Sequence, residues 1–408
     1  MKIGILIWSL NVKGGGQRQA LELANYLKRR GYKVIFFTYF FDKKNTYQFL
    51  VKDLELRFLC KATKKEEMKY WGKPGFGRFL KRIILAKKIV EKMTKDMNIL
   101  NIHDETSFIS AYFAKKKIKN LKTVYMCNDI PCFDWVYKKR FEKNKSFVET
   151  IVFFILDKII TKFFLNYFDK ILVLDKLNKN ALKKCFNINS EIVISGVDLK
   201  EFKFQNKKFN KQENTVILTV GFLEKYKRFE DAILSVNLLK KKGFNCKLII
   251  AGKYDHNPSY FNHLKNLISE LNIRDRIIFK GEVSEKELKE LYRKADIFVF
   301  PAHNQTWGLV VFEAMASGIP VIVSNTTGAS EVLTHMKNAL IFNSKNYEEL
   351  ARMIELLIKN KNIYNRIRLN GRKFVEEKIS WEKYGSKMEE IFLDLCKNKN
   401  HRRQPPHT

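Results

Sequence analysis

The chain opens with a strand, a helix and a second strand, and this order limits the folds open to it. Residues 2–8 form an apolar run of strand length, and residues 17–30 form an amphipathic helix that ends at Gly31. A second apolar run follows at residues 33–38. Two strands joined by a crossover helix run parallel, and the crossover is right-handed. We therefore expect an α/β fold built on a parallel sheet.

A second segment that starts with a strand lies in the middle of the chain and indicates a second domain. Residues 215–220 form an apolar strand, and the lysine-rich stretch before it lacks periodicity. A chain of 408 residues exceeds what one core usually organises, and its 45% hydrophobic content suffices for two cores. We expect domains at residues 1–198 and 199–379, a final helix at 380–396 and a disordered tail at 397–408.

Residues 297–333 are the segment most informative about function. An apolar strand at 297–300 is followed by a polar loop at 303–306, which cannot continue the strand. Thr306 is the expected N-cap of a helix that starts near Trp307. The loop therefore lies at the carboxyl end of a strand, which is where open parallel sheets bind their ligands.

The start of this expected helix suits a phosphate, and its second turn suits a ribose. The backbone N–H groups of Gly308, Leu309 and Val310 face an anion at a helix start, and Gly308 leaves room for it. Glu313 falls in the second turn, where a carboxylate can accept hydrogen bonds from two vicinal hydroxyls. The segment has the features of a sugar-nucleotide half-site.

This segment resembles the donor-binding signature of retaining GT-B glycosyltransferases of the family 4 type, also described as glycosyl transferases group 1. In that family a glutamate, seven residues and a second glutamate precede Ala-Met-Ala-x-Gly-x-Pro-Val. Here Gln305, TWGLVVF and Glu313 precede AMASGIPVIVS. The resemblance implies two Rossmann-like domains that face each other across a cleft, with the acceptor on the first and the nucleotide sugar on the second. It also implies that the final helix crosses back to the first domain.

The resemblance assigns two side chains of the signature. Glu313 is implied to hold the ribose. The family's first acidic position lies against the donor sugar near the reacting carbon, and here it is Gln305. Glutamine exchanges hydrogen bonds but cannot stabilise positive charge as an anion does, so its part in the reaction is the main departure from the family.

The resemblance also places the donor diphosphate and the base. The family's loop after the first strand of the second domain carries an arginine and a lysine that bind the diphosphate. The lysine is present as Lys227, whereas Phe222 replaces the arginine, so Lys225 or Arg228 is expected to supply the second charge. The segment KGEVS resembles the edge where the base stacks, and it contributes Glu282 to the expected donor site.

Three positions in the first domain match the family. The glycine-rich turn with Gly15 and Gly16 matches its donor-side loop, although such a turn alone is as often a tight connection. His103 matches the histidine that faces the cleft, against the alternative of a satisfied structural residue. Asp104 and Glu105 beside it are either acceptor contacts or a solvated turn.

The resemblance implies retaining transfer without an obligatory metal or cofactor. The leaving diphosphate helps to deprotonate the acceptor hydroxyl, and His103, Gln305 and Lys227 are the expected catalytic residues. Six cysteines without metal-ligand spacing look like reduced thiols. No signal peptide pattern precedes the first strand, so a cytoplasmic enzyme is expected.

The charge of the chain is extreme, with 77 basic against 43 acidic residues and a net charge of +34. Two explanations of the positive charge have equal weight: biased codon usage, and a negatively charged functional partner. Nucleic acid is the weaker partner, because the lysines are dispersed and no recognition module is present. An anionic membrane is the better one. Residues 141–168 interleave Lys with Phe and Ile, and their longest apolar run, 151–156, is too short to span a bilayer.

Two interpretations of residues 141–168 stay open: a long helix packed on its own domain, or an amphipathic element in the headgroup region. The expected function is transfer of a hexose from a nucleoside-diphosphate sugar to a lipid-linked or cell-surface glycan. One alternative, motivated by Phe222 and Gln305, is a nucleotide-sugar-binding protein that has lost turnover. The other is a basic nucleic-acid-binding protein.

Overall fold

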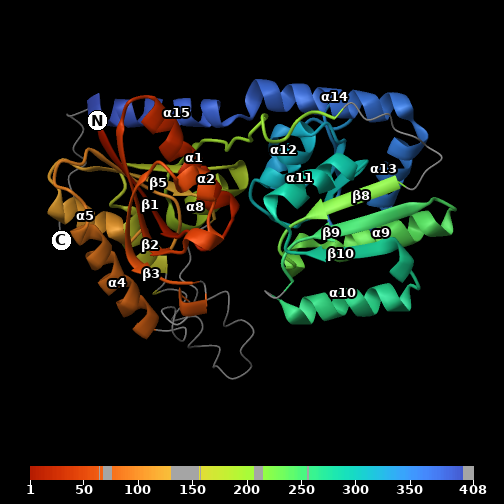
Figure 1. Cartoon of the computed structure of the whole chain (residues 1–408), viewed down its shortest axis with the longest axis horizontal. Coiled ribbons are helices and arrows are strands. Elements are labelled where there is room, and N and C mark those ends of the chain that lie inside the picture. Colours follow the sequence, from red (N-terminus) through yellow and green to blue (C-terminus); the bar gives the residue numbers. More distant parts are fainter. Residues whose placement is uncertain are drawn as a thin grey trace. The chain divides into compact units, whose positions relative to one another are not determined.

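The computed structural model describes residues 1–63, 65–67, 76–129, 156, 158–205, 215–254 and 257–397. The chain forms two compact units (Figure 1). Unit 1 contains Met1–Ile194 and the chain from Trp381 onward, and unit 2 contains Ser195–Ser380. Unit 1 thus ends at Ile194 and not at residue 198, because Val197 forms a parallel β-bridge with Ser380 inside unit 2.

The described part of unit 1 contains a parallel sheet of seven strands in the order β3-β2-β1-β4-β5-β6-β7. Its strands are β1 (Lys2–Ser9), β2 (Lys33–Phe41), β3 (Glu55–Lys61), β4 (Ile99–Ile102), β5 (Lys122–Cys127), β6 (Lys170–Val173) and β7 (Glu191–Ile192). In the register of the first pair, Ile5 lies opposite Phe36. The expected parallel sheet is confirmed.

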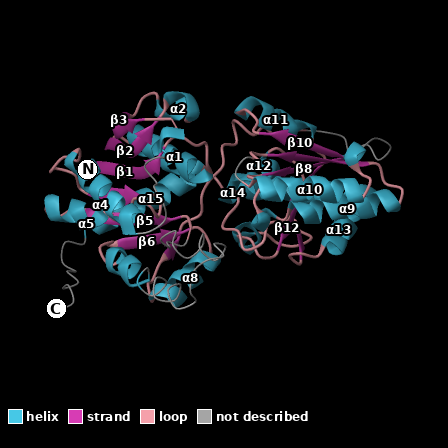
Figure 2. Ribbon diagram, turned by 90° about the horizontal axis from the view of Figure 1, so that it is seen from below, coloured by secondary structure: helices cyan, strands magenta, loops and turns pink. Residues whose placement is uncertain are grey.

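Helices cover both faces of each sheet (Figure 2). Those of unit 1 are α1 (Gly15–Arg29), α2 (Gln48–Val51), α4 (Phe76–Glu91), α5 (Ser110–Lys117), α8 (Lys176–Phe186) and α15 (Trp381–Lys397), with a 3₁₀ turn at Lys43–Asn45. The glycine turn of the sequence is part of a helix, since Gly14 is the N-cap of α1 and Gly15 already lies in its first turn.

The final helix, α15, packs on α1 at very close range. A Cβ on Gly385 would lie 2.3 Å from Cγ of Tyr26, so only glycine allows this approach. The Tyr26 hydroxyl donates to Oε2 of Glu389 at 2.9 Å, and the Tyr32 hydroxyl donates to Oε1 at 2.8 Å. These contacts join the two ends of the chain inside unit 1.

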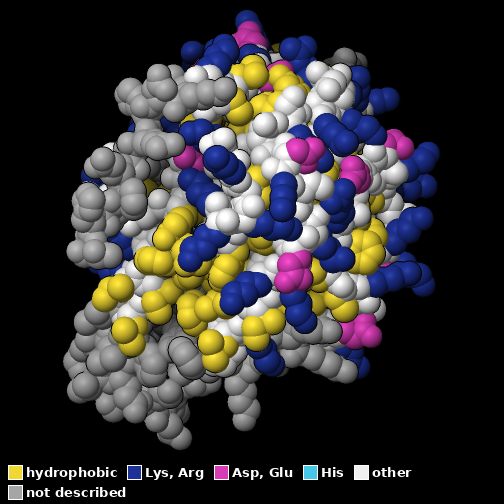
Figure 3. Space-filling view, turned by 90° about the vertical axis from the view of Figure 1, so that its left-hand side faces the viewer, with side chains coloured by type: hydrophobic (Ala, Val, Ile, Leu, Met, Phe, Trp, Pro, Cys, Tyr) yellow, Lys and Arg dark blue, Asp and Glu magenta, His cyan; other side chains and the backbone are white. Residues whose placement is uncertain are grey.

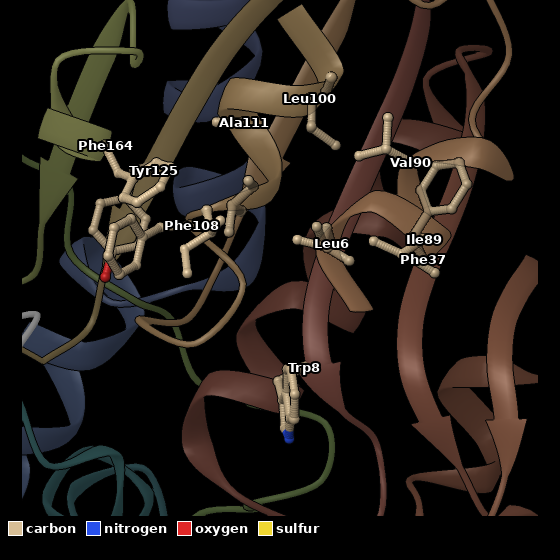
Figure 4. Close-up of a cluster of buried hydrophobic side chains, with 14 of the residues drawn as sticks. Leu6, Trp8, Phe37, Ile89, Val90, Leu100, Phe108, Ala111, Tyr125 and Phe164 are labelled. Carbon is tan, nitrogen blue, oxygen red and sulfur yellow. The ribbon is translucent and has the colours of Figure 1, made fainter. Parts of the chain in front are cut away.

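The core of unit 1 lies between the sheet and helices α4 and α5 (Figure 4). Leu6 of β1 and Phe37 of β2 face Ile89 and Val90 of α4, and all four are buried. The helical residues 158–165 close the far end of this core through Phe164, whose ring lies 6.0 Å from that of Phe108.

The described part of unit 2 contains a second parallel sheet, with six strands in the order β10-β9-β8-β11-β12-β13. The strands are β8 (Thr215–Val220), β9 (Cys246–Ala251), β10 (Ile277–Gly281), β11 (Ile297–Phe300), β12 (Val321–Ser324) and β13 (Leu340–Phe342). Its helices are α9 (Phe229–Lys241), α10 (Pro258–Glu270), α11 (Glu285–Lys294), α12 (Leu309–Ala316), α13 (Tyr347–Lys359) and α14 (Lys361–Lys378). Shorter 3₁₀ turns lie at Lys225–Lys227, Arg274–Arg276 and Gly328–Val332.

Local sequence signals explain where several of these helices start. Ser284 and Glu287 form a reciprocal capping box at α11. Asn257 caps α10, and Pro258 follows as its first residue, where a missing N–H costs nothing. Two parallel Rossmann-like sheets with helices on both faces confirm the expected α/β fold class.

No helix in the described part of the chain is long and apolar enough to cross a bilayer. Most of the segment 141–168, namely residues 141–155 and 157, lies outside the described residues. The expected tail from residue 398 onward also lies outside them.

Candidate active site

The two connections that leave β8 and β11 meet at the switch point of the unit 2 sheet. The chain runs outward from β8 to β9 and β10, then returns to β11 on the other side of β8. The loops after β8 and β11 therefore diverge from neighbouring strand ends, and such a point is the usual ligand site of an open parallel sheet. These loops comprise residues 221–228 and 301–308.

Lys227 is held at this switch point. Its side chain lies over Gly221, where a Cβ would be only 3.2 Å from the lysine Cε. Its Nζ donates to Oε1 of Gln305 at 2.7 Å, a contact between residues that are 78 positions apart. The Nζ also lies 5.6 Å from the centre of the Phe300 ring. The structure thus brings two of the expected catalytic side chains into direct contact.

The contact with Lys227 fixes the orientation of the Gln305 amide. An ammonium can only donate hydrogen bonds, so the oxygen of the amide faces Lys227 and its N–H₂ group points away. The backbone carbonyl of Gln305 accepts a hydrogen bond from the Gly328 N–H at 2.9 Å. A neutral donor group is therefore presented where the family has a carboxylate.

The loop before α12 has a strained backbone. Asn304, Trp307 and Gly308 have positive φ angles of 51°, 33° and 91°, which only glycine adopts without cost. A Cβ on Gly308 would lie 2.8 Å from the ring of Phe300. Strain of this kind is concentrated at functional sites, where the surrounding structure holds it.

The expectation of an N-cap at Thr306 was wrong. Helix α12 begins at Leu309, its N-cap is Gly308, and no side chain caps it. The left-handed turn at Trp307 and Gly308 delays the helix start, because these φ values are incompatible with a helix. Gly308, Leu309 and Val310 nevertheless lie at the helix start, as expected for a phosphate site.

Glu313 lies in the second turn of α12 and is buried. Its Oε2 accepts a hydrogen bond from the hydroxyl of Tyr292 at 2.9 Å. Tyr292 is a fully buried residue of α11 that the sequence did not single out. No local signal could have found it, since the pair is 21 positions apart and Tyr292 resembles any other core residue of an amphipathic helix.

Two cationic side chains act on His303 in the loop after β11. Burial, followed by the charges of Lys345 and Arg228, lowers the pKa of His303 below its ordinary value. The Arg228 guanidinium itself is held by Asp231, through Nε at 3.0 Å and Nη2 at 2.6 Å, and by Glu230 at 2.7 Å. Arg228 therefore braces the first turn of α9.

The remaining donor-side residues are surface groups. Glu282 pairs with Lys253 at 3.0 Å and its carboxylate is exposed, immediately after the end of β10. Lys225 is exposed in the 3₁₀ turn before Arg228, and Phe222 is half-buried just after β8.

His103 of unit 1 is buried immediately after β4. Its Nε2 lies 2.7 Å from Asn101 Oδ1, and its Nδ1 lies 3.2 Å from Gln19 Oε1. Burial lowers the pKa of His103 to about 3, so the ring is neutral at physiological pH. Both ring nitrogens face protein side chains, and the residue fastens α1 to the carboxyl edge of the sheet.

The two acids after His103 have different environments. Asp104 accepts hydrogen bonds from the N–H groups of Trp8, Thr106 and Ser107 at 2.7, 2.8 and 2.9 Å, so it acts as a structural cap. Glu105 is half-buried. Burial, reinforced by the carboxylates of Asp104 and Asp129, raises the pKa of Glu105 to about 7.

Gly15 and Gly16 lie in the first turn of α1, at the carboxyl end of β1. A Cβ on Gly16 would lie 3.4 Å from Asn128 Nδ2, so the turn packs on the polar residue that follows β5. Asn128 Nδ2 in turn donates to the His103 carbonyl at 3.0 Å. Asn128 thus links the glycine turn at Gly16 to the backbone of His103.

Two family models match successive parts of the chain. Residues 13–201 match the model described as Glycosyltransferase Family 4, and residues 200–374 match the one described as Glycosyl transferases group 1. A curated uncharacterized glycosyltransferase of Haemophilus influenzae is 25% identical over 366 residues, which cover 89% of this chain and 92% of the relative. An uncharacterized glycosyltransferase of Methanocaldococcus jannaschii is 33% identical over 170 residues, so that match spans only 42% of either chain.

The fold is also similar to solved structures. The crystal structure of HepE from Anabaena in complex with UDP and glucose superposes with a TM-score of 0.73 at 16% identity, covering 96% of this chain and 99% of HepE. At this identity the similarity concerns the fold alone. The two family models together span residues 13–374, and each of the two units has a parallel Rossmann-like sheet. The chain belongs to the GT-B glycosyltransferases of the family 4 type.

Proposed function

We propose that this glycosyltransferase is a retaining enzyme that moves a hexose from a nucleoside-diphosphate sugar to a lipid-linked or cell-surface glycan. The single observation that carries the donor assignment is the 2.7 Å contact between Lys227 Nζ and Gln305 Oε1 at the switch point. It joins a cation suited to a diphosphate to the residue that stands at the family's sugar-contacting position. HepE, which has a similar fold, was crystallised with UDP and glucose.

In this proposal the diphosphate lies between Lys227 and the uncapped start of α12. Lys227 and the N–H groups of Leu309 and Val310 offset the charge that develops on the leaving phosphate. Glu313, in the second turn of α12, holds the ribose through its carboxylate. These groups replace the function of a divalent metal, so none is required in this mechanism.

The reaction forms one bond and breaks one. The bond from the anomeric carbon to the phosphate oxygen breaks, and a bond to the acceptor oxygen forms on the same face of the sugar. The proton of the acceptor hydroxyl passes to the departing phosphate. Because Gln305 is neutral, it positions the sugar through its N–H₂ group and does not offset positive charge on the ring.

The acceptor is proposed to bind unit 1 near Glu105. His103 positions the carboxyl end of β4 relative to α1, because its two ring nitrogens contact Gln19 and Asn101. A lipid-linked acceptor implies a peripheral location on the anionic cytoplasmic face of a membrane. The net charge of +34 favours such a location.

A thermal-shift screen of the full chain with UDP-, GDP- and ADP-sugars tests the donor site. A ligand at 100 times its dissociation constant adds about 2.7 kcal/mol of stability. Lys227→Met should reduce the shift strongly, whereas Lys241→Met, an exposed change at the far end of α9, should preserve it. Stabilisation by sugar nucleotides without transfer to any glycan would favour the alternative of a binding protein without turnover. Indifference to all of them, with tight binding of nucleic acid, would refute the proposal.

A further inference from the structure

Exposed apolar side chains of unit 1 gather among lysines on one side of the molecule (Figure 3). They belong to α4, α5 and the helical residues 158–165. We name this surface the basic apolar face. Its members are Leu80, Lys81, Ile84, Lys87, Lys88, Tyr112, Phe113, Lys116, Lys158, Ile159, Lys162 and Phe163.

Ring contacts join the three elements into one continuous face. Lys87 Nζ of α4 lies 5.4 Å from the centre of the Phe113 ring of α5. The neighbouring Tyr112 ring lies 5.8 Å from the ring of Phe163. Lys116 Nζ lies 4.3 Å above the same Tyr112 ring. Segments that are distant in the sequence therefore form a single surface.

The exposure of its largest apolar side chains is unusual. Ile84 is 52% exposed and Leu80 is 43% exposed, and they are one helical turn apart on α4. Ile159 is 60% exposed and Phe163 is 48% exposed, again one turn apart. Isolated exposed apolar residues need no explanation, but a contiguous group marks an interaction surface.

The charge of the face has a single sign. The sequence has no Asp or Glu at residues 76–90, 110–117 or 158–168, and these segments are rich in lysine. Lys158 and Lys162 form a ridge directly beside the ridge of Ile159 and Phe163. The ammonium groups can therefore reach an anionic plane while the apolar side chains enter it.

We propose that the basic apolar face binds the anionic phospholipid surface of a membrane. Protein–protein interfaces are depleted of lysine at their centres, and nucleic acid offers no partner to exposed isoleucine and leucine. An anionic lipid surface matches both kinds of side chain in the face. Its phosphate headgroups attract the lysines, and its acyl region accommodates the apolar side chains. The proposal rests on the proposed function, in which the acceptor is carried by a lipid.

The basic apolar face is not confined to the segment 141–168. The sequence pointed to residues 141–168, whereas the described surface also uses α4, which lies far from that segment in the chain. Residues 141–155 and 157 of that segment lie outside the described residues, so Ile84, Ile159 and the lysines beside them are the positions to test.

Flotation of the full chain with vesicles tests the proposal directly. Vesicles of phosphatidylglycerol and phosphatidylcholine in equal parts should bind the protein, and pure phosphatidylcholine should not. Each of Ile84→Ser and Ile159→Ser should weaken binding about tenfold. This loss should be the same at low and at high salt, because it removes apolar contact and not charge. Each of Lys158→Gln and Lys162→Gln should weaken it about fivefold at low salt.

Matched controls come from unit 2. Leu369, 51% exposed, and Ile278, 37% exposed, are changed to serine and should leave vesicle binding unaltered. Wild-type protein that ignores anionic vesicles, or equal losses in the control variants, would overturn the proposal. So would a dimer in solution that Ile84→Ser dissociates, because the face would then bind a second copy of the chain. The thermal shift with sugar nucleotides, measured on the same variants, should remain, so failure of lipid binding and failure of the donor assignment are told apart.

Discussion

The hydrogen bond between Tyr292 and Glu313 has two partners that can be changed separately. A change at Tyr292 tests what the bond contributes to folding, and a change at Glu313 tests whether the carboxylate binds the ribose. The Tyr292 hydroxyl is buried and donates to Glu313 Oε2 at 2.9 Å. A hydrogen bond to a charged group contributes about 1.5–3 kcal/mol. Tyr292→Phe removes only this hydroxyl, so we expect a loss of about 2 kcal/mol in the free energy of unfolding, measured in urea.

Glu313→Gln tests the ribose contact itself. The amide keeps the size of the side chain and can still accept from Tyr292, but hydroxyl donors of a ribose lose a charged partner. Two bonds that each fall from about 2 to about 1 kcal/mol together cost about 2 kcal/mol, which is roughly a 30-fold rise in the dissociation constant. Glu313→Ala should cost more, because it also leaves the buried Tyr292 hydroxyl without this acceptor.

Calorimetry with the nucleotide selected by thermal shift measures these effects. The wild type should lose affinity for the 2′-deoxy and 3′-deoxy nucleotides, and Glu313→Gln should lose little more, because the two changes remove the same interaction. Glu270→Gln, an exposed change in α10, serves as a control. Wild-type affinity in Glu313→Gln, or full additivity with the deoxy nucleotides, would refute the assignment of this carboxylate to the ribose.

Three further predictions concern single side chains. Lys227→Met should reduce turnover by about 10- to 100-fold through the loss of a charged contact to phosphate, and unchanged transfer would place the diphosphate elsewhere. Gln305→Glu should weaken donor binding by about tenfold, because the new carboxylate would pair with Lys227; calorimetry that shows tighter binding would contradict this. The pKa of Glu105 is raised to about 7, above its value in the unfolded chain, so the protonated carboxyl favours the fold and this contribution is lost as the pH rises through 7. Glu105→Gln should therefore leave stability unchanged at acidic pH and raise it by about 1–2 kcal/mol at alkaline pH, allowing for solvent at this half-buried group, and a difference independent of pH in thermal unfolding would exclude the effect.

Local patterns were sufficient for several of the strands. The strands at 215–220 and 297–300 were predicted with the bounds that the structure has, because a short apolar run between polar segments reports on burial directly. The start of α12 was misplaced, because the left-handed turn at Trp307 and Gly308 depends on the packing of the loop against Phe300 and not on residue preference. The candidate donor residues were named by the resemblance to the family, Gln305 and Glu313 from the signature and Lys227 and Glu282 from two other loops.

The sequence alone determined the parallel α/β class, since periodicity acts over a few residues, and its resemblance to the family named the segments proposed to carry the donor chemistry. Only the tertiary structure decided which side chains meet. Lys227 contacts Gln305 because β8 and β11 are neighbours at the switch point, and Tyr292 reaches Glu313 because the fold brings its hydroxyl to the first turns of α12. The basic apolar face is likewise a product of packing, because α5 joins α4 to residues 158–165. Contacts of this kind depend on chain topology, which no local pattern contains.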